Sequence, residues 1–437
     1  MQLDKNNEIS LQRTLIAPYP DATAITLAVG SGQATASTIA ESFLARIAEH
    51  EPHVQAFASF SADRVRQQAA QSTGGPLAGL TVGVKDMFDT VDYPTEYFSP
   101  LYQGHRPARD AHVVTLLRQA GAVVMGKTHT TEFAYMHTGP TRNPHDLRCT
   151  PGSSSAGSAA GMAAGFFPVA LGTQTAGSLI KPAAFCGVHA FKPSFGLVSL
   201  EGIKPLAPSF DTVGWYGRSV RDLALLGRVL IPGLPSAPTV RSTLHLGFCR
   251  TSRWDSVSPD VREAARQAMA RLRDAGNRIS EVVLPPLFDT VFTDHALIND
   301  CEGARSLAKE YATDASRISA STREMIEHGQ SIAWAAEAEA KARLAKQAPV
   351  LADIIGEYDA LLCVSCPTVA LAGLGSTGPS DLIKLWTAFG LPQVNLPLDR
   401  AAGELPVGLQ VIGALRDDAQ LLAAAAALAR DLTWVRP

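Results

Sequence analysis

The sequence has little excess charge of either sign. Its 437 residues contain 38 lysines and arginines against 41 aspartates and glutamates, for a net charge of −3 at pH 7. Binding to nucleic acid relies on clustered Lys and Arg that neutralise phosphates. The nearly balanced charge gives no sign of such a cluster, so we expect no nucleic-acid partner.

Long hydrophobic runs are missing as well. Leu421–Leu428, one of the most apolar stretches, is rich in alanine and far shorter than the ~20 apolar residues that span a bilayer. The beginning of the chain, Met1–Glu8, is too polar for a signal peptide. A hydrophobic content of 46% with 18% charged residues is typical of a globular protein with a large core. We therefore expect a soluble, cytoplasmic protein without a membrane partner.

Cysteine is scarce and scattered. Six cysteines over this length do not form the dense pattern of a disulfide framework. Cys363 and Cys366 make a CxxC, but it lies in the apolar, strand-like run Ala360–Pro367, and no second CxxC or His pair completes a zinc site. We expect neither a metal nor a redox site, and no cofactor.

Two common catalytic motifs are absent or fail on inspection. No serine has the GxSxG context of a nucleophile elbow, which disfavours a Ser–His–Asp hydrolase with His129, His137 or His145 as the base. Gly121–Thr128 matches the letters of a phosphate-binding P-loop, but its Ala-Val-Val-Met interior favours a strand where that loop needs free backbone N–H groups. Nucleotide binding is therefore not expected.

Apolar runs of strand length alternate with helical patterns over most of the chain. Helices are predicted over Thr35–His50, His112–Ala120, Val220–Leu230 and Pro259 to about Ala275, with Asp110 and Ser219 as N-caps of the second and third. Strands are predicted over Val54–Phe60, Leu80–Val84, Ala122–Met125, Ala360–Val364, Val394–Leu398 and Val407–Ile412.

This alternation predicts an α/β fold in which helices cover a mostly parallel or mixed sheet. A helical layer is expected from about 295 to 358, and Pro232–Pro238 is the one connector with linker character. We expect residues 1–437 to form a single domain.

Small residues crowd two stretches that each contain a serine. Ser154 lies in Pro151-Gly-Ser-Ser-Ser-Ala-Gly-Ser-Ala-Ala160, and Ser178 lies in Gly172-Thr-Gln-Thr-Ala-Gly-Ser-Leu-Ile-Lys-Pro182. A lone Lys85 follows the apolar run Thr81-Val-Gly-Val upstream. Small residues leave backbone N–H groups accessible, so a hydroxyl among them suits a nucleophile beside an oxyanion pocket.

These residues resemble the amidase signature family, whose catalytic unit is Ser–cis-Ser–Lys. The family places its two serines 24 positions apart, as Ser154 and Ser178 are here. Matching segments include Gly126-Lys-Thr128, Cys186-Gly-Val188, Phe191-Lys-Pro193, Phe210-Asp-Thr-Val-Gly214, Leu391-Pro392, Leu396-Pro397 and Leu405-Pro-Val-Gly-Leu-Gln410. The resemblance implies a single α/β amidase-signature domain, built on a large twisted mixed β-sheet with helices on both faces. It also implies hydrolysis of a linear C–N amide bond.

The resemblance also implies a role for each residue of the unit. Ser178 would form the acyl-enzyme, and the backbone N–H groups of Thr175, Ala176, Gly177 and Ser178 would make the oxyanion hole. Ser154, preceded by a cis peptide, would relay protons to Lys85. A lysine acts as a base only when neutral, a state that burial favours. Asp86 should not oppose this, because neighbours on a strand point to opposite faces.

Substrate contacts are expected from several residues near these motifs. Malonamidase-like members carry Ser-Val-Ile-Arg-Pro where this chain has Ser178-Leu-Ile-Lys-Pro182, and that arginine binds a substrate carboxylate. Lys181 keeps the charge but not the two-pronged donor, which leaves open an anionic substrate or a packing role. Tyr135 and His137 are expected to contact substrate, and Met136, Trp386 and Phe389 are further pocket candidates.

Two other functions remain open. The glutaminase (A) subunit of a tRNA-dependent amidotransferase resembles this chain equally at the serines, although Gln174 replaces the aspartate of its Asp-Thr-Gly-Gly-Ser segment. A scaffold without activity is disfavoured, because Lys85, Ser154 and Ser178 are all present. The expected partner is a small-molecule amide, and a homodimer is left open.

Overall fold

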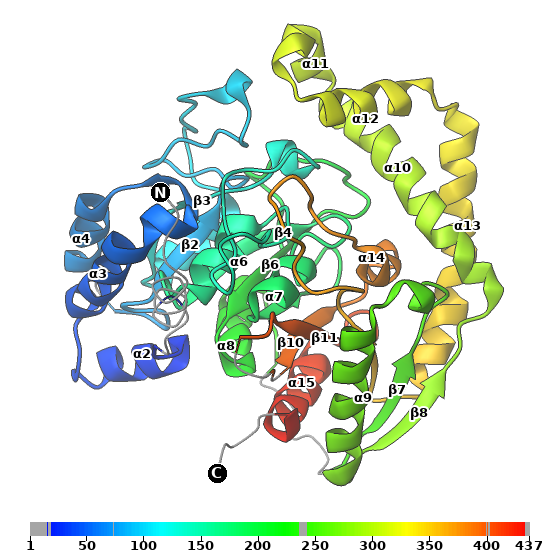
Figure 1. Ribbon diagram of the computed structural model, residues 1–437. Coiled ribbons are helices and arrows are strands. Elements are labelled where there is room, and N and C mark those ends of the chain that lie inside the picture. The colour runs from blue at the N-terminus through cyan, green and yellow to red at the C-terminus, as the bar shows by residue number, and fades with distance from the viewer. Residues whose placement is uncertain are drawn as a thin grey trace.

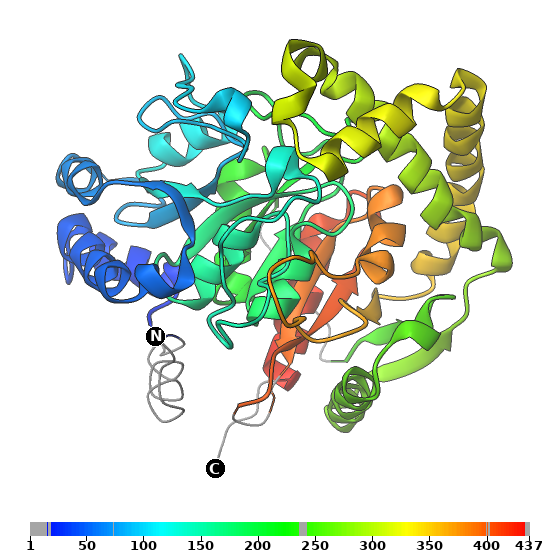
Figure 2. The same cartoon turned by 45° about the horizontal axis from the view of Figure 1, so that its top comes forward.

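The computed structural model describes residues 15, 19–72, 74–235, 243–398, 400 and 403–432. Within these residues, eleven strands form one mixed sheet in the order β1-β3-β2-β4-β6-β5-β10-β11-β9-β7-β8. The strands are β1 (Phe57–Phe60), β2 (Thr81–Lys85), β3 (Val123–Thr128), β4 (Val169–Gln174), β5 (His189–Lys192), β6 (Thr212–Gly217), β7 (His245–Cys249), β8 (Arg278–Val282), β9 (Ala360–Val364), β10 (Gln393–Leu398) and β11 (Val407–Ile412). The chain is thus a single-domain α/β protein (Figures 1 and 2).

Strand direction divides the sheet into three parts. Strands β3, β2 and β4 are parallel, and so are β9, β7 and β8 at the other end. Between β4 and β9, each pair of neighbouring strands in the order β4-β6-β5-β10-β11-β9 is antiparallel. Because β2 and β4 are parallel, their carboxyl ends lie side by side, and this edge of the sheet carries the candidate site.

Helices cover both faces of the sheet. They are α2 (Ala22–Gly30), α3 (Ala36–Val54), α4 (Ala62–Ala70), α5 (His112–Gln119), α6 (Ala156–Ala163), α7 (Ile180–Cys186), α8 (Val220–Leu230), α9 (Pro259–Asp274), α10 (Val291–Ser306), α11 (Ala308–Asp314), α12 (Ala320–Ser331), α13 (Trp334–Gly356), α14 (Asp381–Ala388) and α15 (Asp418–Leu432).

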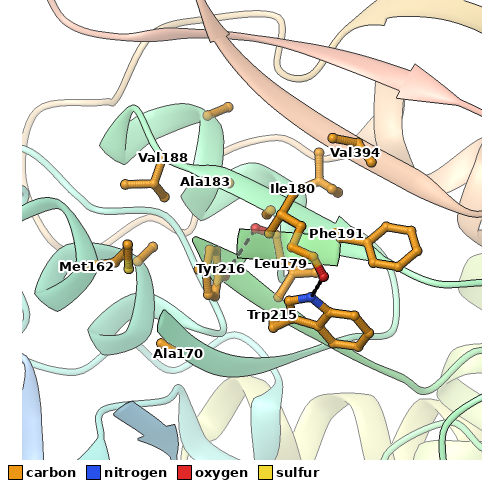
Figure 3. Packing of buried hydrophobic residues seen from close by; sticks show 14 of the residues in the cluster. Met162, Ala170, Leu179, Ile180, Ala183, Val188, Phe191, Trp215, Tyr216 and Val394 are labelled. Atoms are coloured by element: carbon orange, nitrogen blue, oxygen red, sulfur yellow. Dashed lines mark hydrogen bonds between the residues drawn. The ribbon is translucent and has the colours of Figure 1, made fainter. Parts of the chain in front are cut away.

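Two neighbouring residues of β6 show which helices lie on which face. The Tyr216 hydroxyl donates to Leu179 O at 3.1 Å, just before α7, whereas Trp215 Nε1 donates to Leu223 O of α8 at 2.9 Å. Successive strand side chains point to opposite faces, so α7 and α8 lie on opposite sides of β6. Both rings are fully buried, among the side chains drawn in Figure 3. The side chains packed between β6 and α7 on one face, and between β6 and α8 on the other, form the hydrophobic core around the central strands.

Helices α10 to α13 form one all-helical stretch over residues 291–356, beside the sheet (Figure 2). Buried carboxylates join this stretch to loops of the sheet layer: Glu132 accepts from Thr322 Oγ1 at 2.9 Å, and Glu310 pairs with Lys204 at 2.7 Å. Of the connector 232–238, residues 236–238 lie outside the described residues.

Local capping follows the sequence at one helix and departs from it at another. Ser219 accepts from Asp222 N and caps α8, as predicted. Asp110 does not cap α5, so that prediction is wrong. Its carboxylate instead accepts from Val91 N at 2.8 Å and from Arg118 Nε at 2.9 Å.

Candidate active site

The lysine and the first serine of the predicted unit meet at the carboxyl ends of β2 and β4. Lys85 is the last residue of β2, and its Nζ lies 2.7 Å from Ser154 Oγ and 2.6 Å from Thr173 Oγ1 of β4. Ser154 lies in the loop before α6, and the Ser153–Ser154 peptide bond is cis. Among the described residues, the hydrogen-bond partners of the amine are thus two hydroxyl oxygens.

Burial controls the charge of Lys85. Its side chain is fully buried, and burial lowers the pKa of the amine to about 7, although Asp211 acts in the opposite direction. Asp86 points to the other side of the strand and pairs with Lys127 at 2.9 Å. Lys127 is itself a buried residue of β3, so Gly121–Thr128 leads into a strand instead of forming a phosphate-binding loop. Lys85 can thus act as a proton acceptor close to neutral pH.

Ser178 lies in the loop between β4 and α7 and is half-buried. It lines a cavity of about 370 Å³ together with Ser153, Thr175, Ala176 and Gly177. Ser155 N donates to Ser178 O at 3.2 Å, which brings the two serine loops into contact. Among the described residues, the Ser178 hydroxyl and the N–H groups of Ala176, Gly177 and Ser178 have no hydrogen-bond partner. Three N–H groups therefore remain free to donate to an anion in this loop.

The side chain of Gln174 shapes this loop. Its Oε1 accepts from Leu179 N and Ile180 N, both at 3.0 Å, and its Nε2 donates to Thr387 Oγ1 at 3.0 Å. Gln174 thus takes the first N–H groups of α7. Ser178 does not cap that helix, which begins at Ile180, and its hydroxyl stays free.

Two side chains that sequence reasoning missed hold Thr175 at the start of the loop. Asp211 Oδ1 accepts from Thr175 Oγ1 at 2.6 Å, and His295 Nε2 lies 2.9 Å from Thr175 O. Asp211 belongs to a segment that resembles the family, which is a weak signal for a role. His295 follows no motif and comes from α10.

The residues predicted to contact substrate line two different cavities in the structure. Tyr135, Met136 and Lys181 line the Ser178 cavity. Lys181 is buried, donates to Gly378 O at 2.9 Å, and has its pKa lowered by burial to about 8. His137 lies instead on a second cavity, stacked on Phe98 with ring centroids 5.8 Å apart.

The two remaining pocket candidates pack elsewhere. Trp386 is fully buried in α14, and Phe389 packs edge-on against Phe288. Neither belongs to the described lining of the Ser178 cavity. That lining adds charged residues that the sequence did not indicate, namely Asp300, Asp381 and Lys384. The cavity therefore presents charges of both signs.

Two further sequence expectations concern the cysteines and the helices. In the described ranges, no group of three or more His, Cys, Asp or Glu residues could hold a metal ion. Cys363 and Cys366 are buried free thiols. None of the helices in those ranges is long and apolar enough to cross a membrane.

Known proteins resemble this chain over nearly its whole length. The family model described as Amidase matches residues 38–422. The A subunit of glutamyl-tRNA(Gln) amidotransferase from Roseiflexus sp. (strain RS-1) is 32% identical over an alignment of 461 residues, covering 92% of this chain and 94% of that protein.

Solved structures agree with the sequence comparison. A crystal structure described as an amidase has a TM-score of 0.87 at 30% identity and covers 95% of this chain and 100% of its own. The crystal structure of the glutamyl-tRNA(Gln) amidotransferase A subunit from Thermotoga maritima has a TM-score of 0.76 at 26% identity and covers 90% and 91%. The chain belongs to the amidase signature family and is an enzyme that hydrolyses C–N amide bonds.

Proposed function

We propose that Ser178 is the nucleophile and that Lys85 and Ser154 move its proton. The observation that carries this proposal is the buried contact of 2.7 Å between Lys85 Nζ and Ser154 Oγ, in a loop that touches the Ser178 loop. Ser178 Oγ attacks the amide carbon while its proton passes to Ser154, whose own proton passes to neutral Lys85. The negative oxygen that forms accepts from the N–H groups of the 175–178 loop.

In the second half of the reaction, the protons move back from Lys85 through Ser154. The C–N bond breaks as Ser154 protonates the leaving nitrogen and takes a proton back from Lys85. Water then attacks the acyl group on Ser178 through the same relay, releasing the acid and restoring the serine. Each step needs only groups already present, so no cofactor takes part in this proposal.

Glutamine is the proposed substrate. It is a small amide with a carboxylate and an ammonium group, and the cavity presents Lys181 and Lys384 beside Asp300 and Asp381. Lys181 has a pKa of about 8, so it is mostly charged at neutral pH and suits a carboxylate. The amidotransferase relatives, 32% identical over nearly the whole chain, support this choice more than a stand-alone amidase. The proposed partner is accordingly the tRNA-binding part of an amidotransferase.

A stand-alone amidase acting on a small carboxylated amide is the second candidate. Two observations favour it: Gln174 stands where the amidotransferase protein usually has aspartate, and the solved amidase matches over its full length with the higher TM-score. This enzyme would need no partner protein.

Ammonia release from a panel of amides separates the candidates. The panel is glutamine, succinamate and the neutral hexanamide, each assayed with the chain alone and with a co-expressed tRNA-binding protein. Glutamine turnover that rises when this partner co-purifies supports the first candidate. Faster turnover of succinamate by the chain alone supports the second, and a preference for hexanamide contradicts both.

A further inference from the structure

Two successive carbonyl groups of the 175–178 loop, the proposed catalytic loop, accept hydrogen bonds from side chains of distant helices, and one of these side chains, His295, also lines the Ser178 cavity. His295 Nε2 lies 2.9 Å from Thr175 O, and Thr387 Oγ1 donates to Ala176 O at 2.8 Å. His295 lies in α10, 120 positions after Thr175, and Thr387 lies in α14, 211 positions after Ala176. Both are at least 98% buried.

The imidazole of His295 is fixed in orientation and in tautomer. Its ring stacks on Phe210 with centroids 4.2 Å apart and an interplanar angle of 17°. Burial lowers the pKa of His295 to about 3, so the ring is neutral at physiological pH and has one N–H. A carbonyl oxygen can only accept, so that hydrogen must be on Nε2. Within the part of the chain that the structure describes, Nδ1 has no partner.

Other side chains direct the hydroxyl of Thr387. Its oxygen accepts from Gln174 Nε2 at 3.0 Å and from Gln393 Nε2 at 3.3 Å. Its single proton can go to Ala176 O at 2.8 Å or to Ile383 O at 3.2 Å, and the shorter contact is the one to the loop. Gln174 therefore supports the loop from two sides, through Thr387 and through the start of α7.

Peptide planarity turns these contacts into control of the N–H groups. In a trans peptide the carbonyl oxygen and the following N–H lie in one plane and point in opposite directions. Holding Thr175 O fixes the direction of the Ala176 N–H, and holding Ala176 O fixes that of the Gly177 N–H. These are two of the three loop N–H groups that have no acceptor among the described residues.

We propose that His295 and Thr387 are positioning residues that aim the Ala176 and Gly177 N–H groups at the oxygen that becomes negative in the reaction. The proposal rests on the proposed role of Ser178. Neither side chain needs to touch the substrate to act. It also makes the catalytic loop depend on α10, part of the helical layer, and on α14.

The test uses variants that separate the hydrogen bond from the packing. His295→Phe keeps a ring on Phe210 but removes the donor, and His295→Gln restores a donor without the ring. Thr387→Val removes the hydroxyl at nearly the same volume, and Thr387→Ser restores it. His245→Phe is a matched control, because His245 lies in β7, away from the 175–178 loop. Its ring also packs on an aromatic ring, that of Tyr358 with centroids 4.8 Å apart, and its Nε2 lies 3.1 Å from Ser280 Oγ.

The readout is the rate of covalent labelling by a fluorophosphonate, which needs no knowledge of the substrate. We expect His295→Phe and Thr387→Val each to lower the maximal labelling rate ~10- to 100-fold, with half-saturating probe concentration within about twofold of wild type. His295→Gln and Thr387→Ser should recover most of the loss, and His245→Phe should label like wild type. If His295→Phe does not fold, the Thr387 pair carries the same test.

Two results would overturn the proposal. One is labelling of His295→Phe and Thr387→Val at the wild-type rate. The other is a loss that the donor-restoring variants do not recover, which would assign the effect to packing. Failure of the proposed function is seen separately, because then wild type would not be labelled or the label would persist in Ser178→Ala.

Discussion

Raising the pH from 6 to 8 should increase the rate of amide hydrolysis, because the proposed base must be neutral. Burial lowers the pKa of Lys85 to about 7, against ~10.4 for an exposed lysine. Below pH 7 the amine is mostly protonated and cannot accept the proton that Ser154 passes on. Above pH 7 it is mostly neutral, so activity rises with pH. For a carboxylated amide, kcat/KM should fall again above about pH 8, where Lys181 loses the charge proposed to bind the carboxylate.

The size of the rise follows from the pKa. With a pKa of about 7, ~9% of the enzyme has neutral Lys85 at pH 6 and ~91% at pH 8, which gives a ~tenfold increase in kcat/KM for a neutral amide, whose binding does not depend on the charge of Lys181. His129 and His295 cannot produce this rise, because burial lowers their pKa values to about 4 and about 3 and both stay neutral between pH 6 and 8.

The assay is kcat/KM for ammonia release between pH 5 and 9.5 at constant ionic strength. Lys85→Arg is the informative variant, since a guanidinium stays charged at every pH and should leave no active form. Lys181→Met is the control and should retain the limb near pH 7. A wild-type rate that does not change between pH 6 and 8, or the same limb in Lys85→Arg, would refute the assignment of Lys85 as the base.

Three further predictions concern single side chains. Ser154→Ala should lower kcat by ~10²- to 10⁴-fold while circular dichroism stays unchanged, because the relay between Ser178 and Lys85 is broken; near-normal turnover would show that Ser154 is not needed. Lys181→Met should reduce kcat/KM ~10- to 100-fold for carboxylated amides and leave kcat/KM for neutral amides unaffected, because a hydrogen bond to a charged group is lost. An equal loss on both kinds of amide would assign Lys181 to packing. Lys192 is fully buried, and burial lowers its pKa to about 7 in the fold. The unfolded chain therefore holds more protons from pH 7 to 10, and the free energy of unfolding rises with pH there. Lys192→Met should remove up to ~1.4 kcal/mol per pH unit of that rise, measured by urea denaturation at pH 7 and 9; identical slopes in both proteins would contradict it.

The proposed reacting groups could be predicted from sequence because their signals are local. Lys85 ends an apolar strand, and Ser154 and Ser178 lie in stretches of small residues with a fixed separation. Parallel pairing of β2 with β4 then brings the lysine to the second stretch. Strand pattern and small-residue content are both properties of a few consecutive residues.

The side chains that support the loop could not be found in this way. His295 and Thr387 are ordinary helix residues, and only the packing of α10 and α14 brings them to Thr175 and Ala176. Ser178 has a residue type that favours a helix cap, yet the longer Gln174 side chain takes those N–H groups first. Tertiary packing decides the first case, and in the second a side chain five residues before Leu179 outcompetes the serine.

His137 lies away from the cavity in which its closeness to Tyr135 in sequence would place it. Tyr135 and His137 are two residues apart but border different cavities. The preceding residues Phe133 and Ala134 both have positive φ, 49° and 61°, a conformation that nothing in their side chains predicts. The chain therefore turns where an extended path would be expected.

Identification of the labelled serine tests the central claim most directly. The chain is treated with a fluorophosphonate, digested and examined by mass spectrometry, alongside Ser178→Ala assayed for ammonia release. We expect one adduct, on Ser178, and neither labelling nor hydrolysis in the variant. An adduct on another residue, or hydrolysis by Ser178→Ala at the wild-type rate, would contradict it.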